Sequence, residues 1–477
     1  MIASTIVQLF RDALPAGRVI DDPDLVGPWT SDWRGKYHGA AAAILSPRTV
    51  AEVATIVTLA AEHGVALVPQ GGNTSMVGGA TPPADGGALI LSLRAMNAIR
   101  SLDTDANLVV CEAGVILQTL HEAAEAAGRR FPLSLGARGA ATVGGLISTN
   151  AGGTQVLRHG TMRAQVEGLE AVLPDGSILH GLSALKKDNR GYDLRHLLIG
   201  AEGTIGIVTA ASLRLVPAIA ARSVAWAGTG SPEQALALLR HMEDALGDAV
   251  EGFEVMSDEI LNVVLSEVPG SRRPIAGAAQ WHALIEAVTA DPAQADALTT
   301  RMEAALASAL DKGLLTDAAI ASSEAQADAL WKLRESVSMS EKAKGPALQY
   351  DISVPVSGMP AFMIDAAQAC ADTFPGATAA SYGHLGDGNI HFHVRPPRDP
   401  ADRGAAWVAG RGEEVSRFVN DLVVAAGGSI SAEHGIGQMK VAELARLASP
   451  ARLHAMQAIK AAFDPKGIMN PGKLVPR

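Results

Sequence analysis

Residues 383–394 read Gly-His-Leu-Gly-Asp-Gly-Asn-Ile-His-Phe-His-Val, and this stretch restricts the local fold more than any other in the chain. Its segment 385–388 has the composition of a tight turn. The residues that follow, 389–395, alternate between apolar and polar side chains, as a β-strand with one buried face does. The pattern therefore predicts a hairpin with His391 and His393 on one face of its second strand, and with His384 just across the turn.

The same hairpin carries three of the chain's 13 histidines, and a lone His in a strand is usually a residue with no special task. Downstream, the residues from Ser429 to Gly437 predict a short strand that ends in Glu433 and one more imidazole, His434. Two His and a carboxylate are typical ligands of zinc or a similar ion in a site that keeps an open position. The spacing favours a metal site.

The composition excludes several classes of protein. A chain of 477 residues, of which 48% are hydrophobic and 19% charged, is expected to form two or three domains with a large core. Few aromatic residues and abundant Ala favour a helix-rich protein with α and β elements. The net charge of −11 argues against nucleic acid as a partner, but a local basic pocket can still bind a small anion.

Three features of the chain bear on its location. Cys111 and Cys370 are its only cysteines, too few for a disulfide scaffold or an iron–sulfur cluster. No apolar run approaches the ~20 residues of a membrane span. The first residues lack a basic segment before their apolar ones and predict an amphipathic helix rather than a signal peptide. We therefore expect a cytoplasmic protein.

Glycine-rich loops dominate the first part of the chain, at residues 70–79, 131–153 and 200–208. Dense glycine with Ser, Thr and Asn exposes backbone N–H groups and lets a ligand approach closely, as in phosphate-binding loops. Neither a G-x-G-x-x-G that opens a helix nor a Walker A motif is present. Although any one such loop is more often a plain turn, the three together indicate a large nucleotide.

After Pro217 strands and helices alternate and glycine becomes sparse, which predicts a separate domain whose helices pack on a sheet. Ser323 is expected to cap a helix with Gln326 in the capping-box position. Arg334 and Ser338 are four apart and are expected to share a face of that helix. An Arg on a helix is usually only a solvated charge, but Arg334 is close in sequence to the histidine hairpin.

These motifs together resemble a known family. Pro69-Gln-Gly-Gly-Asn-Thr, the run Gly144–Gly153 and Gly203-Thr-Ile-Gly-Ile-Val resemble the FAD-binding domain of the vanillyl-alcohol oxidase/p-cresol methylhydroxylase (VAO/PCMH) superfamily. The hairpin, Glu433-His-Gly and the C-terminal Asn470-Pro-Gly-Lys resemble its D-2-hydroxyacid dehydrogenase branch, which includes D-2-hydroxyglutarate and D-lactate dehydrogenases and the glycolate oxidase D subunit. The resemblance covers nearly the full length.

The resemblance implies an α+β architecture in three parts. Residues 1–216 would form a two-subdomain FAD-binding domain, and 217–425 a substrate domain built on an antiparallel sheet with covering helices. Residues 426–477 would form a helical C-terminal segment that completes the active site and returns to the FAD domain. It also implies FAD and a divalent metal, Zn²⁺ or another ion such as Mn²⁺. The FAD would be non-covalent, because residues 71–79 offer no His to which relatives tether the flavin.

By resemblance each site residue receives a role. His384, His391 and Glu433 match the metal ligands, and His434 matches the catalytic base. The substrate would be contacted by Arg334, which grips its carboxylate, and by Ser338, Gln349 and His393. The residues implied to contact FAD are Pro69, Gln70, Gly71, Gly72, Asn73, Thr74, Ser75, Pro132, Leu135, Gly136, Thr142, Gly144, Gly145, Ser148, Asn150, Gly152, Gly153, Glu202, Gly203, Gly206, Ile207, Val208 and Asn470.

The expected reaction is oxidation of a D-2-hydroxy acid to the 2-oxo acid, with D-2-hydroxyglutarate favoured as substrate. D-lactate or another monocarboxylate is the alternative, because Gln349 stands where hydroxyglutarate enzymes tend to carry a Lys. The electron acceptor would be an electron-transfer flavoprotein or a quinone-linked carrier, and a homodimer is compatible with the resemblance. Two other classes remain open: a metallohydrolase without flavin, and a non-catalytic flavoprotein subunit of a larger oxidase complex.

Overall fold

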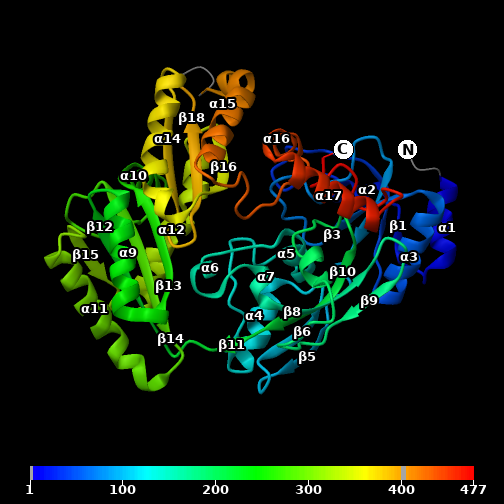
Figure 1. Cartoon of the computed structure of the whole chain (residues 1–477), viewed down its shortest axis with the longest axis horizontal. Coiled ribbons are helices and arrows are strands. Elements are labelled where there is room, and N and C mark those ends of the chain that lie inside the picture. The colour runs from blue at the N-terminus through cyan, green and yellow to red at the C-terminus, as the bar shows by residue number, and fades with distance from the viewer. Residues whose placement is uncertain (1–3, 399–403, 477) are drawn as a thin grey trace. The chain divides into compact units, whose positions relative to one another are not determined.

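The computed structural model describes residues 4–398 and 404–476. By its internal contacts the chain divides into two compact units. Unit 1 comprises Met1–Gly153, His159–Ala218 and Glu433–Arg477, and unit 2 comprises Thr154–Arg158 and Ile219–Ala432. Unit 2 is therefore inserted into the sequence of unit 1. In Figure 1 the colours show this directly, because the blue and cyan elements of unit 1 are joined by the red C-terminal helices.

A four-stranded sheet forms the first half of unit 1, with the strand order β1-β2-β4-β3. The strands are β1 (Val19–Ile20), β2 (Ala41–Leu45), β3 (Ala66–Gln70) and β4 (Ala88–Ser92). Strands β2, β4 and β3 run parallel, so their carboxyl ends lie at the same edge of the sheet. Helix α3 (Val50–His63) packs on this sheet; the Thr49 side chain caps its first turn, and Gly64, with φ of +65°, ends it.

A five-stranded antiparallel sheet forms the second half of unit 1, in the order β5-β6-β10-β8-β9. Its strands are β5 (Ile99–Asp103), β6 (Leu108–Glu112), β8 (Val166–Val172), β9 (Ile178–Gly181) and β10 (Ile207–Arg214), and a two-stranded ribbon pairs β7 (Arg129–Arg130) with β11 (Val216–Pro217). The helices of unit 1 besides α3 are α1 (Ser4–Ala13), α2 (Pro23–Val26), the 3₁₀ turn η1 (Gly27–Trp29), α4 (Leu117–Ala126), α5 (Val143–Thr149), α7 (Met162–Gln165), α8 (Leu194–Leu198), α16 (Val441–Leu447) and α17 (Pro450–Phe463). The short α6 (Val156–His159) lies where the chain passes between the units.

Residues after α17 pair with the edge strand β3 of the four-stranded sheet. Met469 forms a parallel bridge with Leu67 of β3, and the amides of Leu67 and Asn470 donate to the carbonyls of Ile468 and Leu67 at 2.8 Å each. The Lys460 ammonium donates to the carbonyls of Thr204 and Met469 at 2.7 and 2.8 Å. The C-terminal segment thus covers the edge strand β3 of a sheet that begins near the N-terminus.

A seven-stranded sheet organises unit 2, in the order β15-β12-β14-β13-β17-β18-β16. The strands are β12 (Ala221–Thr229), β13 (Val250–Ser257), β14 (Trp281–Thr289), β15 (Asp317–Ile320), β16 (Leu348–Ser353), β17 (Thr378–His384) and β18 (Asn389–Arg395), and every neighbouring pair is antiparallel. The antiparallel sheet expected for this part of the chain is thus confirmed.

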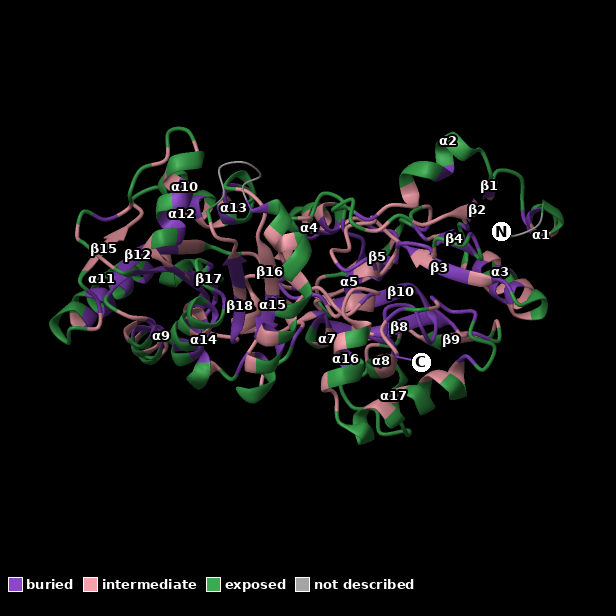
Figure 2. Cartoon of the chain, turned by 90° about the horizontal axis from the view of Figure 1, so that it is seen from above, coloured by how far each residue is buried: buried purple, intermediate pink, exposed green. Residues whose placement is uncertain are grey.

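Helices cover both faces of this sheet. One face packs against α9 (Pro232–Leu246), α11 (Ala295–Asp311), α14 (Met359–Thr373) and α15 (Ala405–Ala425); its strand side chains include Ile390, Phe392 and Val394, as the alternation in the sequence predicts. The other face packs against α10 (Asp258–Glu267), α12 (Glu324–Glu335) and α13 (Val337–Ala343). Short 3₁₀ turns stand at η2 (Gly247–Ala249), η3 (Pro292–Gln294) and η4 (Val356–Gly358). In Figure 2 the strands are mostly buried and the outer turns of the helices exposed.

Two local expectations are wrong. The helix that carries Arg334 ends at Glu335, and Ser338 belongs to the next helix, because ψ of −11° at Ser336 tightens the turn between them. The short strand predicted to run from Ser429 to Glu433 is a single bridge between Ser429 and Ser353, followed by irregular backbone. Gly427, with φ of +73°, departs from strand geometry just before it. In the described residues, no helix is long and apolar enough to cross a membrane.

Candidate active site

The glycine-rich loops of unit 1 approach one another closely. A Cβ on Gly71 would stand 2.1 Å from the Thr142 hydroxyl, and one on Gly72 would stand 1.8 Å from the carbonyl of Ala140. A Cβ on Gly203 would stand 2.3 Å from the Pro69 ring. Any side chain at these glycines would therefore force the loops apart, which explains why the sequence places glycine there.

Four non-glycine residues of the expected cofactor set have left-handed backbones. Asn73, Asn150, Glu202 and Asn470 have φ of +54°, +49°, +50° and +40°. Such conformations are uncommon outside glycine, and they cost on the order of 1–3 kcal/mol when the surroundings impose them. Their concentration in these loops is typical of a binding site.

Buried polar atoms in the same loops lack a hydrogen-bond partner within the described chain. They are Oε1 of Gln70, Oγ1 of Thr142 and Oδ1 of Asn470. Buried acceptors are normally satisfied, so these atoms are available to a ligand with donor groups. Together with the glycine cradle, they fit the polar parts of a dinucleotide such as FAD.

Glu202 joins the loops to the C-terminal segment. Its carboxylate accepts hydrogen bonds from the amides of Ile436 and Gly437 at 2.7 and 2.8 Å, and its carbonyl accepts one from Nδ2 of Asn470 at 2.7 Å. Burial raises the pKa of the Glu202 carboxyl, while the two amide donors oppose the rise. Burial also lowers the pKa of Lys473 to about 8, although the charge of Glu202 opposes this change. These contacts of Glu202 were not predicted from the sequence.

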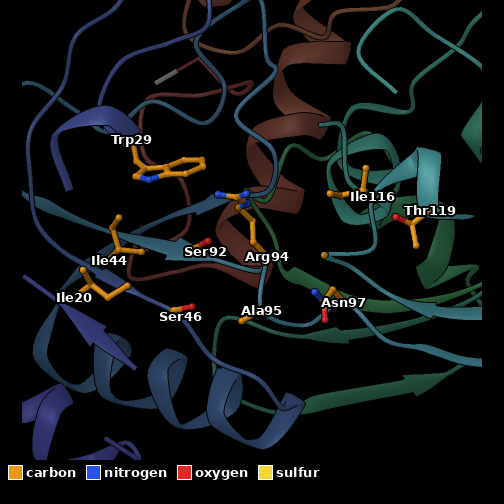
Figure 3. Close-up of a pocket in the computed structure, with 11 residues that line it drawn as sticks. Ile20, Trp29, Ile44, Ser46, Ser92, Arg94, Ala95, Asn97, Ile116 and Thr119 are labelled. Atoms are coloured by element: carbon orange, nitrogen blue, oxygen red, sulfur yellow. The ribbon is translucent and has the colours of Figure 1, made fainter. Parts of the chain in front are cut away.

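A recess of about 370 Å³ opens at the carboxyl edge of the four-stranded sheet. Figure 3 shows Arg94 reaching toward Trp29, whose ring centroid lies 4.5 Å from the guanidinium. The other residues around it are Ile20, Ile44, Ser46, Ser92, Ala95, Asn97, Gly114, Ile116 and Thr119. None of the residues expected to contact FAD lines this recess.

The hairpin of unit 2 presents polar side chains in rows across one face of the sheet. In one row Glu254 of β13 lies opposite His384 of β17, which lies opposite Asn389 of β18. In the next row Tyr382 lies opposite His391, and the two ring centroids are 4.8 Å apart. Residues directly opposite in antiparallel strands share a face, so the imidazoles face the same way, as the sequence predicts.

The structure brings His384, His391 and Glu433 together, with one ligand atom of each lying within 4.8 Å of the others. Glu433 is the residue at the boundary between the units; its predecessor Ala432 is held by a 3.3 Å hydrogen bond to the carbonyl of Asp351 on β16. Ligand atoms at ~2.1 Å from an ion lie at most ~4 Å apart. The three residues therefore fit a divalent ion after an inward movement of less than ~1 Å.

A buried carboxylate that sequence reasoning missed connects two of the expected site residues. Glu254 is fully buried; its Oε1 accepts from Nδ1 of His384 at 2.5 Å and its Oε2 accepts from Nε of Arg334 at 2.7 Å. Burial alone would raise the pKa of Glu254, but the charge of Arg334 and the His384 imidazole lower it to about 2. A Glu flanked by Phe253 and Val255 in the buried strand Val250–Ser257 is the sequence signal that could have revealed it.

Arg334, expected to grip the substrate carboxylate, is held against the same sheet face. Its guanidinium lies 4.8 Å from the centroid of the Tyr382 ring, which in turn contacts the His391 ring. Since Nε binds Glu254, a bidentate clamp on a substrate carboxylate would use the two terminal nitrogens. Ser338 is exposed on the following helix.

The third polar row holds the residues expected to select the substrate. Gln349 of β16 lies opposite His393 of β18, whose Nδ1 is 3.3 Å from Glu341. Two cations that could otherwise assist Gln349 in binding a second carboxylate, Lys344 and Arg395, are engaged in ion pairs. Lys344 binds Glu267 at 2.9 Å, and Arg395 binds both Glu341, at 2.7 Å, and Glu259.

His434 directly follows Glu433 and is half-buried. The loop after it has positive φ at Gly435, +79°, and at Gly437, +53°. A Cβ on Gly437 would stand 2.3 Å from the carbonyl of Val77. The backbone beside His434 is therefore fixed by close packing within unit 1.

Comparison with known proteins identifies the class. A family model described as "FAD linked oxidases, C-terminal domain" matches residues 219–474, and one described as "FAD binding domain" matches 41–181. Two solved structures share the fold over 99% of this chain. They are an alkyldihydroxyacetonephosphate synthase, with a TM-score of 0.75 over 85% of that chain at 16% identity, and p-cresol methylhydroxylase, with 0.73 over 96% at 15%. The VAO/PCMH-type fold and the FAD dependence expected from the sequence are thus confirmed, and the interpretation as a flavin-free hydrolase is wrong.

Curated relatives narrow the family. The D-2-hydroxyglutarate dehydrogenase of Bos taurus, named as mitochondrial, is 38% identical over 96% of this chain and 81% of its own length. The D-2-hydroxyglutarate dehydrogenase of Xanthomonas citri pv. viticola is 35% identical over 97% of this chain and 95% of its own length. The chain therefore belongs to the FAD-dependent D-2-hydroxyacid dehydrogenase family, and it is a flavin-dependent dehydrogenase.

Proposed function

We propose that the chain oxidises D-2-hydroxyglutarate to 2-oxoglutarate, using FAD in unit 1 and a divalent metal ion, Zn²⁺ or Mn²⁺, held by His384, His391 and Glu433. Two observations carry the proposal: one ligand atom of each of these three residues lies within 4.8 Å of the others, and Arg334 shares the buried carboxylate of Glu254 with His384. The names of relatives that match nearly the whole chain support the substrate.

Each site residue has a task in this reaction. The terminal nitrogens of Arg334 would hold the carboxylate next to the hydroxyl-bearing carbon and fix its orientation. His434, as a neutral imidazole, would accept the hydroxyl proton. A metal ion on the three ligands would stabilise negative charge that develops on the hydroxyl oxygen. Bound FAD would accept the hydride at N5.

A monocarboxylate such as D-lactate is the second candidate, and the third polar row favours it. Gln349 offers only a neutral amide to a second carboxylate, and Lys344 and Arg395 are already paired with carboxylates. If the substrate is a dicarboxylate, His393, opposite Gln349, would have to supply a further polar contact to its second carboxylate.

From the family resemblance, we propose that an electron-transfer flavoprotein or a quinone-linked carrier reoxidises the flavin. Independently of the resemblance, we propose that the enzyme works in the cytoplasm.

A panel of D- and L-2-hydroxy acids, assayed with an artificial electron-accepting dye, tests the proposed function. D-2-hydroxyglutarate should give the highest kcat/KM, and L-enantiomers should give none above background. If D-lactate is oxidised and D-2-hydroxyglutarate is not, the substrate is a monocarboxylate, the second candidate. Absence of turnover with every 2-hydroxy acid, in a preparation that carries FAD and metal, would refute the proposal.

A further inference from the structure

Glu254 occupies a position where a carboxylate is costly. It lies on β13, which is flanked by β14 and β17 in the interior of the seven-stranded sheet, and none of its surface is exposed. Its neighbours Phe253 and Val255 belong to the apolar core on the opposite face. Burial of an ionised carboxylate costs several kcal/mol unless it is paired and hydrogen-bonded. Only its contacts can justify a carboxylate here.

Its two oxygens divide their contacts between two different elements. Oε1 accepts from Nδ1 of His384 on β17, directly opposite in the sheet, and Oε2 accepts from Nε of Arg334 on α12. These are the partners that the described structure gives its side chain. One carboxylate therefore bridges a strand and a helix, and at each end it holds a residue of the proposed active site.

The contact with His384 sets the state of its imidazole. An ionised carboxylate only accepts hydrogen bonds, so Nδ1 must carry the proton and Nε2 is the nitrogen with a lone pair. A metal-ligating His commonly donates its other N–H to a carboxylate, which fixes both the tautomer and the orientation of the ring. Glu254 thus prepares His384 to bind a cation through Nε2.

The contact with Arg334 sets the direction of the guanidinium. An unrestrained Arg side chain has about 2 kcal/mol of rotamer entropy to lose on binding a ligand. Here Nε is fixed by Glu254 at 2.7 Å and the guanidinium lies 4.8 Å from the Tyr382 ring centroid. The plane of the guanidinium, and so the direction of its terminal nitrogens, is fixed before any substrate arrives.

We infer that Glu254 is a positioning residue that orients the metal ligand His384 and the carboxylate clamp Arg334 at the same time. A single buried group thereby sets the spacing between the substrate hydroxyl, near the ion, and the substrate carboxylate, at the clamp. The inference rests on the proposed function, since it assigns the partners of Glu254 to the metal and to the substrate.

The chemistry of a Glu254→Gln substitution makes the inference testable. The side-chain amide has almost the same shape, but it presents one acceptor and one N–H donor, whereas both partners present N–H groups. If the amide NH₂ faces His384, the imidazole must move its proton to Nε2, where the ion has to bind. If the amide NH₂ faces Arg334, its N–H groups oppose the Nε–H group of Arg334, and the guanidinium must turn away from position 254. The variant must lose at least one function.

The experiment compares Glu254→Gln with Glu251→Gln. Glu251 lies on the same strand, is 2% exposed, and forms an ion pair with Arg158 at 3.0 Å, so it is a matched buried carboxylate without a proposed site partner. Zn²⁺ affinity is measured on purified FAD-loaded protein by competition with a chromophoric chelator, and kcat and KM are measured separately. We expect Glu254→Gln to bind Zn²⁺ 10–100-fold more weakly, the usual effect of losing such a partner, or to raise KM about tenfold, or both. Glu251→Gln should change neither.

Two further variants separate the partners of Glu254. Arg334→Met should raise KM and leave Zn²⁺ affinity within about threefold, because His384 keeps its carboxylate. If Glu254→Gln does not fold, Glu254→Asp replaces it; its carboxylate is one methylene shorter and cannot reach both partners, so it should lose the same properties. Wild-type Zn²⁺ affinity and KM in a folded variant at position 254 would overturn the inference. A wild-type protein that binds no metal or oxidises no 2-hydroxy acid would instead refute the proposed function.

Discussion

Gln349→Lys tests which acid the enzyme prefers. Gln349 lies opposite His393, in the row beside the one that holds His391. A lysine there would project from the same sheet face and could meet the distal carboxylate of a five-carbon diacid. Lys344 and Arg395 do not supply this charge, because they are paired with Glu267 and Glu341. The new ammonium would therefore add a charge that the distal carboxylate otherwise lacks.

The size of the effect follows from the type of bond. A hydrogen bond to a charged group contributes roughly 1.5–3 kcal/mol, against roughly 0.5–1.5 kcal/mol for a neutral one. Replacement of the amide by an ammonium should thus stabilise the bound dicarboxylate by about 1 kcal/mol, or about fivefold in kcat/KM. A monocarboxylate has no group at that position, so its kcat/KM should not rise.

The assay measures kcat/KM for D-2-hydroxyglutarate and D-lactate with a dye acceptor and compares their ratio. Gln368→Lys, an exposed position on α14, adds the same charge away from the site and should leave the ratio unchanged. If Gln349→Lys also leaves the ratio unchanged, position 349 does not contact the substrate and the selectivity argument is wrong.

Four other outcomes are expected. Acid precipitation should leave a colourless pellet and a yellow supernatant, because the flavin is not covalently bound; a yellow pellet would contradict this. Chelation, or His384→Ala, should abolish turnover while the flavin spectrum persists, and full activity without metal would exclude the ion. His434→Ala should lower kcat about 10²–10⁴-fold with a smaller change in KM; near-normal turnover would show that another residue is the catalytic base. The pKa of Lys473 is about 8 in the folded protein, below its ordinary 10.5. Between about pH 8 and pH 10.5 the unfolded chain therefore binds more protons at this residue than the folded protein does. The contribution of Lys473 to the unfolding free energy should thus rise with pH across that range. Denaturant titrations of the flavin-free protein measure this, with Lys473→Met as control, and an equal pH dependence in both proteins would disprove it.

The features that could be predicted from the sequence are those that depend on residues close to one another in the chain. The alternation in 389–395 is enough to place His391 and His393 on one strand face. Thr49 and Ser323 reveal their helix starts because a cap acts within three residues. The glycine-rich loops are visible by composition.

The features that remained hidden depend on long-range register. Glu254 and His384 are 130 residues apart, and they meet only because β13 pairs with β17 in one particular alignment. The helix break at Ser336 depends on one backbone angle that no residue type dictates. For the same reason, the ion pairs that occupy Lys344 and Arg395 could not be foreseen from local sequence.

The insertion of unit 2 into unit 1 has a consequence for synthesis. When a ribosome has made residues 1–218, β3 has not yet received the bridge from Met469, and Glu202 still lacks the amides of Ile436 and Gly437. An uncovered strand edge can pair with other chains, and partly folded intermediates aggregate through such edges. The flavin unit is therefore vulnerable until 433–477 emerge, after the whole of unit 2. Co-expression with a chaperone, and a supply of riboflavin, should therefore raise the soluble yield more for this chain than for a protein whose cofactor unit is continuous in sequence.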